Sequence, residues 1–221
     1  MGGWWVHELW NAGRGTELIA WIFWVIASIT LHELAHGWAA MWEGDDTPRV
    51  TGHMTANPVV HMGVPSMLIF LILGIAWGMM PVNPYRFRHG KWGRIFVSAA
   101  GPLMNLFIAA VVLTILGCII DPQTATSASN GFNVEIFLLT GGFLNLILFA
   151  LNMLPVPPLD GSNILANLSN TIAGWYRHPQ AQMSGLLLFF LLIWTNMFSV
   201  VFTWAQIGAA NYAGFIWSLT H

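Results

Sequence analysis

Four long apolar stretches constrain the fold of this chain more than any other feature of its sequence. They run over about residues 17–42, 93–120, 133–154 and 184–204, and each provides the about 20 helical residues that cross the hydrocarbon core of a bilayer. Only 7% of the residues are charged and 56% are hydrophobic, whereas about a quarter of the residues in a soluble domain are charged. We therefore predict an all-α polytopic membrane protein, built as a bundle of transmembrane helices in the lipid bilayer.

The segment between the first two core helices has a mixed pattern. Residues 50–60 combine β-branched and turn-forming residues, which predicts a short strand pair. Residues 64–81 are apolar but interrupted by glycines and prolines, so they fit either a plain span or a re-entrant hairpin buried within protein. We thus expect a short β or re-entrant segment at this place in the bundle.

The two ends of the chain carry shorter apolar segments. Trp4, Trp5, Leu9 and Trp10 predict an interfacial anchor. The first residues lack the basic region and small-residue cleavage site of a signal peptide, so we expect none. Residues 208–219 are too short for a span and are expected at the interface or packed against the bundle.

Charge and cysteine content exclude several classes of protein. The net charge of −2 offers no basic surface for nucleic acid, and the single cysteine, Cys118, permits neither an intrachain disulfide nor a cysteine-based metal site. No repeat or linker marks a second domain. We predict one integral-membrane domain over residues 1–221, with its core at about 17–165 and C-terminal helices at 184–219. The sequence carries no signal for an oligomeric state.

Basic residues indicate the orientation in the membrane. Four of them lie between Arg86 and Arg94, and Arg177 follows the 133–154 helix, whereas the polar loop 121–131 has none. By the positive-inside tendency, the first two regions are cytoplasmic and the loop is external. We expect a multi-pass integral membrane protein located in the cell membrane.

The strongest chemical signal is the run His32-Glu33-Leu34-Ala35-His36 inside the first apolar stretch. Residues four apart share a helix face, so both imidazoles can reach one metal ion. Glu33 is placed to take a proton from a water molecule that attacks a carbonyl. The alternative is a polar contact between helices, but ionisable groups within a bilayer are costly, and a metal ion compensates for them.

A third ligand is predicted after the 133–154 helix. Three prolines between Pro155 and Pro158 prevent a regular helix, and Asp160 then offers an oxygen ligand, followed by Gly161 for a sharp turn. Without the histidines, Asp160 fits an N-cap of a helix over residues 162–174. Together with them it completes a three-ligand zinc site with one Zn²⁺ per chain, although Co²⁺ and Mn²⁺ also suit this ligand set.

These motifs together resemble the site-2 protease family of intramembrane zinc metalloproteases. The pieces that carry the resemblance are, in chain order, His32–His36, Gly52–Thr55 with Asn57-Pro58, Pro81–Tyr85, Ala100–Asn105 and Asn152–Gly161. They cover about residues 30–165, and the chain has no room for a PDZ or CBS domain, so it is similar to a minimal member of the family.

The resemblance implies a role for each site residue. His32, His36 and Asp160 bind zinc, and Glu33 is the catalytic acid and base. Asn152 holds the substrate carbonyl or its oxyanion, although a satisfied amide at a helix end is an equal alternative. Asn105 is expected to support packing around the site. The implied reaction is hydrolysis of peptide bonds within or near a transmembrane segment of a membrane-protein substrate, in regulated intramembrane proteolysis.

The ligand positions also bear on topology. His36 lies toward the Trp42 end of its helix, and Asp160 lies just beyond the predicted cytoplasmic end of another. They can meet only if Trp42 also faces the cytoplasm, which requires residues 64–81 to return to the side where they began. A hairpin does this and a single crossing does not. The active site is then accessible from the cytoplasmic side.

A rival interpretation is a zinc-binding scaffold or transporter, because intramembrane His and Asp residues also mark ion pathways. Against it, Glu33 is the only acid well inside a predicted helix, and it lies where a base is needed. An inactive homologue is disfavoured because Glu33 and the three ligand residues are all present. We therefore predict a peptidase.

Overall fold

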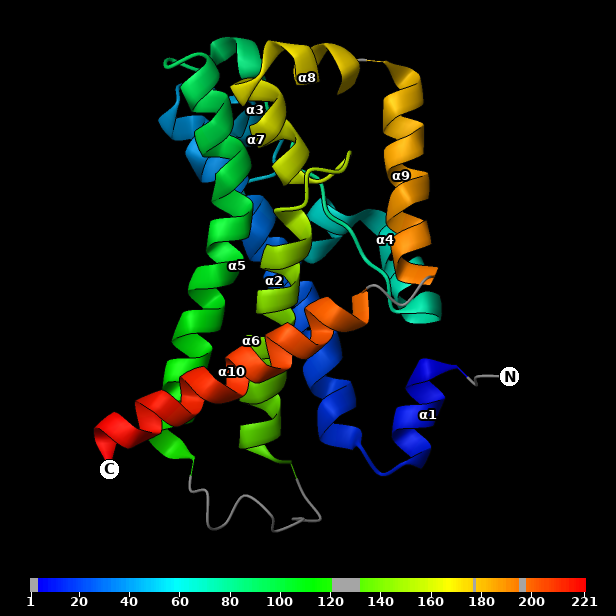
Figure 1. Cartoon of the computed structure of the whole chain (residues 1–221), viewed down its shortest axis with the longest axis vertical. Helices are drawn as coiled ribbons and strands as arrows, with labels where there is room; N and C mark the ends of the chain where they lie inside the picture. The colour runs from blue at the N-terminus through cyan, green and yellow to red at the C-terminus, as the bar shows by residue number, and fades with distance from the viewer. Residues whose placement is uncertain (1–3, 121–131, 177, 195–197) are drawn as a thin grey trace.

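The computed structural model describes residues 4–120, 132–176, 178–194 and 198–221, and all regular elements within these ranges are helices (Figure 1). In chain order they are α1 (Trp5–Asn11), α2 (Gly15–Trp42), α3 (Thr47–Val50), α4 (Pro58–Leu73), a 3-10 turn (Pro84–Arg86), α5 (Lys91–Ile119), α6 (Val134–Asn152), α7 (Asp160–Leu168), α8 (Asn170–Tyr176), α9 (Pro179–Trp194) and α10 (Phe198–Thr220). The loop expected at 121–131 and Arg177 lie outside the described residues.

Three long helices, α2, α5 and α6, form the centre of the molecule (Figure 1). Each is long and apolar enough to cross a membrane, so three of the four predicted stretches are confirmed as helices of that kind, with ends within about two residues. Glycines let these helices approach closely. A Cβ atom on Gly141 would lie 2.2 Å from the Trp24 ring of α2, and one on Gly142 would lie 2.3 Å from the Leu113 side chain of α5.

The segment after α4 folds back along that helix. α4 begins after Asn57, whose side chain accepts from the Val59 amide, and it ends at Gly74, where φ is +74°. Residues 75–83, the returning segment, then run back: Met79 N donates to His61 O at 2.9 Å, and Asn83 N donates to Asp45 Oδ2 at 2.6 Å. Since Asp45 follows the end of α2, the stretch returns to the side where it began, as the hairpin alternative requires.

The predicted strand pair at residues 50–60 is wrong. In this region the chain leaves α3, turns at Gly52 with φ +74°, and enters α4 at Pro58. Its backbone groups bond locally, with His53 N donating to Pro48 O at 2.9 Å and Thr55 N to His53 O at 2.9 Å. β-branched residues favour strands only when a partner strand is available, and the described residues contain no strand.

The predicted single span at residues 184–204 is also wrong, because its described parts belong to two helices with different axes, while 195–197 lie outside the described residues. α9 ends at Trp194 and α10 begins at Phe198, and Figure 1 shows α10 crossing α5 and α6 while α9 runs in another direction. Ala209 and Ala213 of α10 are buried against Leu113 and Leu116 of α5. Residues 208–219 therefore pack against the bundle, which was one of the two alternatives expected for them, the other being a position at the membrane interface. A hydropathy window carries no signal for the point where a helix axis changes direction.

The N-terminal helix α1 is fastened to the far end of α4. The indole N–H groups of Trp4 and Trp5 both donate to Leu71 O, at 2.7 and 3.2 Å, and the Trp5 ring packs on Phe70 with ring centroids 5.7 Å apart. These bonds satisfy a carbonyl in the last turn of α4, which has no partner within its own helix. Trp10 is 69% exposed, and the interfacial anchor stays a prediction.

A buried carboxylate joins the end of α2 to the start of α5. Glu43 is 4% exposed; the His89 amide donates to its Oε2 at 3.0 Å, and His89 Nδ1 lies 3.0 Å from its Oε1. Burial alone would raise the pKa of Glu43. The hydrogen bonds from His89 and the positive charges of His89 and Arg88 together outweigh burial, so the pKa of Glu43 lies below its usual value. The ionised form of Glu43 therefore stabilises the folded state.

Replacing Glu43 by glutamine should flatten the acid side of the stability profile. Glu43 has a lower pKa when folded than the about 4.3 of an unfolded chain, so its contribution is complete above that pH and is lost as the pH falls through the folded value. From about pH 6 to about pH 3, the wild-type Tm should fall about 2–4 °C more than that of Glu43→Gln. Thermal unfolding in detergent measures this, and parallel profiles would contradict it.

Candidate metal centre

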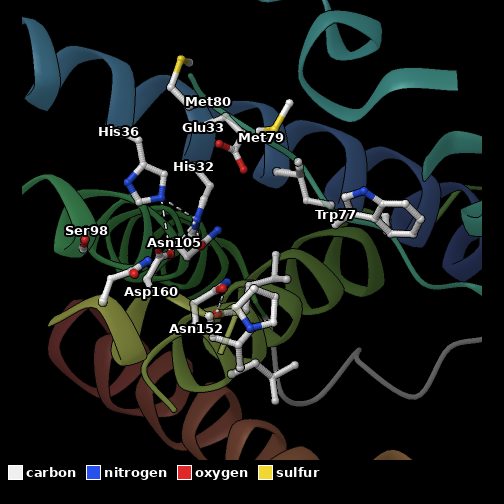
Figure 2. Close-up of a pocket in the computed structure, with 18 of the residues that line it drawn as sticks. His32, Glu33, His36, Trp77, Met79, Met80, Ser98, Asn105, Asn152 and Asp160 are labelled. Carbon is white, nitrogen blue, oxygen red and sulfur yellow. Dashed lines mark hydrogen bonds and ion pairs between the residues drawn. The ribbon is translucent and has the colours of Figure 1, made fainter. Parts of the chain in front are cut away.

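The three predicted ligands converge at one point between α2 and α7. His32 and His36 lie one turn apart on α2 and are 8% and 9% exposed, and their Nε2 atoms are 3.0 Å apart. Oδ2 of Asp160, the first residue of α7, lies 3.2 Å from Nε2 of His32 and 3.4 Å from Nε2 of His36 (Figure 2). In the described part of the chain these three residues form the group that could hold a metal ion.

The proline segment after α6 brings Asp160 to the histidines. Leu159 occupies the N-cap position of α7, so Asp160 is not the cap, and its carboxylate faces α2 instead. The chain turns tightly here: a Cβ on Gly161 would lie 2.3 Å from Met153 O and 2.5 Å from Leu154 O. Glycine is required at this position because the start of α7 packs directly on the backbone that ends α6.

α5 holds both imidazole rings in place. Its residues Val97, Gly101 and Asn105 follow each other at four-residue intervals and so share one helix face. Val97 O lies 2.7 Å from Nδ1 of His36, and Oδ1 of Asn105 lies 2.6 Å from Nδ1 of His32. Because a carbonyl oxygen only accepts, Nδ1 of His36 carries a hydrogen, and in the neutral imidazole Nε2 then has a free lone pair.

The donor atoms fit a zinc ion. Two imidazole nitrogens and one carboxylate oxygen are a ligand set of catalytic zinc sites. Three electron-rich atoms within 3.4 Å of one another repel unless a proton or a metal ion lies among them. Gly101 leaves room beside them, since a Cβ there would lie 2.4 Å from Nε2 of His36 and 2.5 Å from Nε2 of His32.

A cavity of about 910 Å³ opens beside the three ligands. Glu33, Asn105 and Asn152 contribute polar groups to its lining, and most of the remaining lining is apolar, including Trp77 and Met79 of the returning segment (Figure 2). Such a space admits an apolar chain with a few polar groups to orient it.

Glu33 and Asn152 face this cavity from opposite walls. The Glu33 carboxylate packs against Gly78 of the returning segment, where a Cβ would lie 2.6 Å from its Oε1. Ser66 of α4 fixes the position of Gly78, because its Oγ donates to Trp77 O at 2.7 Å and accepts from Trp77 N at 2.9 Å. Nδ2 of Asn152 donates to Leu148 O at 3.0 Å, which uses one of its two amide hydrogens and leaves the other for a ligand.

Sequence reasoning expected Asn105 to support packing around the site, but it missed three other groups near the histidines. Gly101 was recognised only as part of a motif, and Val97 acts through its backbone. Asn145 of α6 contacts Asn105 and none of the three candidate ligands. The four-residue spacing on α5 matches that of the histidines on α2, and this is a signal that could have identified the facing positions.

Comparisons with known proteins identify several similar sequences. The model of the family described as "Peptidase family M50" matches residues 20–132 and 117–195. "Putative zinc metalloprotease YwhC" of Bacillus subtilis is 32% identical over 188 residues, which is 85% of each chain. "Putative zinc metalloprotease Rip2" of Mycolicibacterium smegmatis is 31% identical over 76% of this chain and 64% of its own length. "Zinc metalloprotease MJ0392" of Methanocaldococcus jannaschii is 28% identical over 71% of this chain and 38% of its own length. No solved structure matches the chain significantly.

Proposed function

The chain belongs to peptidase family M50 and is a multi-pass zinc metallopeptidase, and from this premise we propose that it hydrolyses peptide bonds within or near the transmembrane segments of other membrane proteins. The observation that carries the proposal is the depth of the site. His32, Glu33 and His36 are buried within α2, a 28-residue helix long and apolar enough to cross a bilayer. A peptide bond that reaches these residues enters the membrane region of the protein.

In this proposal zinc is held by His32, His36 and Asp160. A zinc ion at this place supplies a Lewis acid that polarises a carbonyl oxygen and acidifies water. Glu33 takes one proton from the attacking water as the water oxygen bonds to the carbonyl carbon, and it delivers that proton to the nitrogen as the carbon–nitrogen bond breaks. The packing of Glu33 on Gly78 supports this role, because it holds the carboxylate at the cavity wall.

Asn152 is proposed to orient the substrate carbonyl or the oxyanion that forms from it. It lines the same cavity as Glu33, and its bond to Leu148 O fixes the amide while one hydrogen remains to donate. A fixed amide donor stabilises developing negative charge because it does not reorganise during the reaction.

The substrate class follows from the cavity lining and the chemistry. Apolar walls formed by residues such as Ile69, Leu73 and Met80 favour a hydrophobic segment, and the carbonyls of such a segment are accessible only where its helix unwinds. The site is proposed to open to the cytoplasmic side of the cell membrane, since the basic region 86–94 contacts the end of α2 through His89 and Glu43. Release of membrane-held regulators is one use of this activity.

Cleavage of an artificial transmembrane substrate tests the proposal. When the Gly, Pro and Asn residues near the scissile bond of a cleaved peptide are replaced by leucine, the rate of cleavage should fall at least about tenfold. The reason is that leucine favours the helix by up to about 1 kcal/mol per glycine replaced and more per proline. Mass spectrometry of the products in proteoliposomes locates the cut. Equal rates for both peptides, or cuts confined to water-exposed tails, would count against intramembrane hydrolysis.

A further inference from the structure

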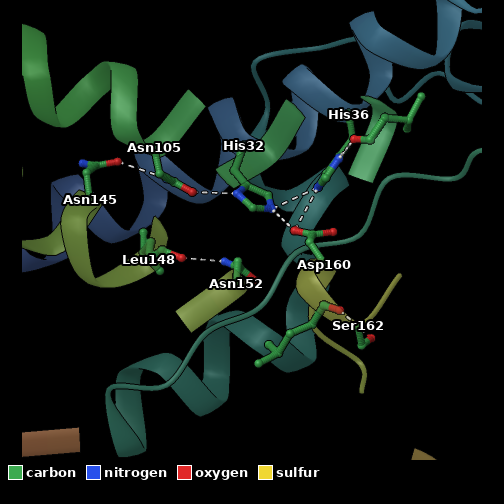
Figure 3. A network of polar contacts seen from close by, with 10 residues as sticks. His32, His36, Asn105, Asn145, Leu148, Asn152, Asp160 and Ser162 are labelled. Carbon is green, nitrogen blue, oxygen red and sulfur yellow. Dashed lines mark hydrogen bonds and ion pairs between the residues drawn. The ribbon is translucent and has the colours of Figure 1, made fainter. Parts of the chain in front are cut away.

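Two buried amides connect α6 to the metal centre through α5. Nδ2 of Asn145 donates to O of Gly141, one turn earlier in α6, at 2.9 Å. Nδ2 of Asn105 donates to Oδ1 of Asn145 at 3.0 Å, and Oδ1 of Asn105 lies 2.6 Å from Nδ1 of His32 (Figure 3). Asn105 is 1% exposed and Asn145 is 0% exposed, so bulk water does not compete for these bonds.

A backbone carbonyl determines the direction of every bond in this series. Gly141 O can only accept, so the amide nitrogen of Asn145 faces it and the amide oxygen faces Asn105. Asn105 must then turn its nitrogen toward Asn145 and its oxygen toward His32. Nδ1 of His32 consequently carries the hydrogen, and its Nε2 keeps the lone pair that a metal ion needs. We call Gly141 O, Asn145 and Asn105 the amide relay.

The two histidines thus have the same tautomer, with the hydrogen on Nδ1, but different groups fix it. His36 is held by Val97 O directly, whereas His32 is held by Gly141 O through the two amides. If the relay is broken at Asn145, nothing prevents the Asn105 amide from rotating by half a turn. Its nitrogen would then face Nδ1 of His32, and the imidazole hydrogen would move to Nε2, which cannot bind zinc in that form.

We propose that Asn145, which neither contacts the three ligands nor lines the cavity, is a positioning residue for zinc. It acts through Asn105 and holds His32 in the tautomer and ring orientation that bind the ion. This inference rests on the zinc site of the proposed function and extends that site to α6. Groups that orient metal-binding histidines in this way commonly change metal affinity by about 10- to 100-fold when they are replaced.

Zinc affinity of the full-length chain in detergent, measured by competition with a fluorescent zinc chelator, tests the relay without relying on proteolysis. Asn145→Leu keeps the side-chain volume and removes both relay bonds, so the affinity for zinc should fall at least about tenfold. Asn105→Leu should have at least the same effect. The double variant should bind zinc no more weakly than Asn105→Leu alone, because both substitutions interrupt one series of bonds.

Two further variants separate this role from a structural one. Leu144→Ala removes packing from the neighbouring buried position of α6 and destabilises the fold, but it leaves the relay intact and should bind zinc like the wild type. Asn105→Asp keeps an oxygen acceptor for Nδ1 of His32 and should retain zinc where Asn105→Leu loses it. If Asn145→Leu does not fold, the comparison of Asn105→Asp with Asn105→Leu still tests whether the relay positions His32.

Wild-type affinity in Asn145→Leu, equal losses in Asn145→Leu and Leu144→Ala, or a greater loss with Asn105→Asp than with Asn105→Leu would overturn the relay. Additive losses in the double variant would do the same. A wild-type chain that binds no zinc would overturn the metal site itself, so the two failures are distinguishable.

Discussion

Alanine at position 101 is expected to remove zinc from the protein, with a loss of affinity of about 100-fold or more and a corresponding loss of proteolysis. The added methyl would lie 2.4 Å from Nε2 of His36 and 2.5 Å from Nε2 of His32, inside the space that the metal and its ligands need. The rings cannot retreat from α5 without breaking the bonds to Val97 O and Asn105, which flank Gly101 on the same helix face.

The prediction for Gly101→Ala opposes the usual effect of the substitution. Glycine to alanine within a helix normally stabilises it by about 1 kcal/mol. Gly214 of α10 provides the matched control, because a Cβ there meets nothing within 4 Å, so Gly214→Ala should keep both zinc and activity. Metal content by mass spectrometry and chelator competition measure the difference. A Gly101→Ala chain that binds zinc as tightly as the Gly214→Ala chain would show that the ion lies elsewhere.

Glu33→Gln should stop peptide hydrolysis while leaving zinc in place. Glutamine has the size of glutamate but cannot accept a proton, so the general acid and base is lost and cleavage should slow by about 10²- to 10⁴-fold. Glu33 is not one of the three ligands that converge, so the variant should still carry one zinc per chain.

The control for Glu33→Gln is Glu17→Gln on the same helix. Glu17 pairs with Arg14 near the start of α2, far from the histidines, and its replacement should leave the rate of cleavage unchanged. Single-turnover cleavage of a transmembrane peptide, with zinc content measured on the same samples, gives both quantities. Glu33→Gln cleaving within about tenfold of the wild type would remove Glu33 from the mechanism.

The central helices were predictable because their sequences allow few alternatives. A run of 20 or more apolar residues satisfies its backbone in a bilayer only as a helix, and the predicted ranges 17–42, 93–120 and 133–154 match α2, α5 and α6 closely. The range 184–204 failed because α10 turns across the bundle and packs its small residues on α5. This packing depends on the shape of the facing helix, which hydropathy does not describe.

The convergence of the three candidate ligands was predictable from the sequence, whereas most of the groups around them were not. His32 and His36 carry a helical spacing that needs no tertiary information, and Asp160 follows a proline segment that ends a helix. Val97 and Asn145 contribute only once α2, α5 and α6 are aligned, because a backbone carbonyl leaves no trace in residue type and a buried asparagine fits many roles. The relative axial position of three helices is not readable from one sequence.

The strand pair expected at residues 50–60 is a second case in which tertiary contacts, rather than local residue type, decide the structure. β-branched residues signalled a strand, but Asn57 and Pro58 begin a helix there, with Pro58 at a position where its missing N–H costs nothing. The returning segment, residues 75–83, is the extended part of this region, and it is held by α4 through Ser66 and His61. Such a pairing between helix and extended chain has no short-range sequence signature.

Locating the zinc ion itself is the most direct test of the account. Crystals of the wild-type chain loaded with one equivalent of zinc, measured on both sides of the zinc absorption edge, should show one anomalous peak bounded by Nε2 of His32, Nε2 of His36 and the Asp160 carboxylate, at about 2.0–2.2 Å from each. A peak at any other place, or none at this place in a preparation whose cleavage requires zinc, would contradict it.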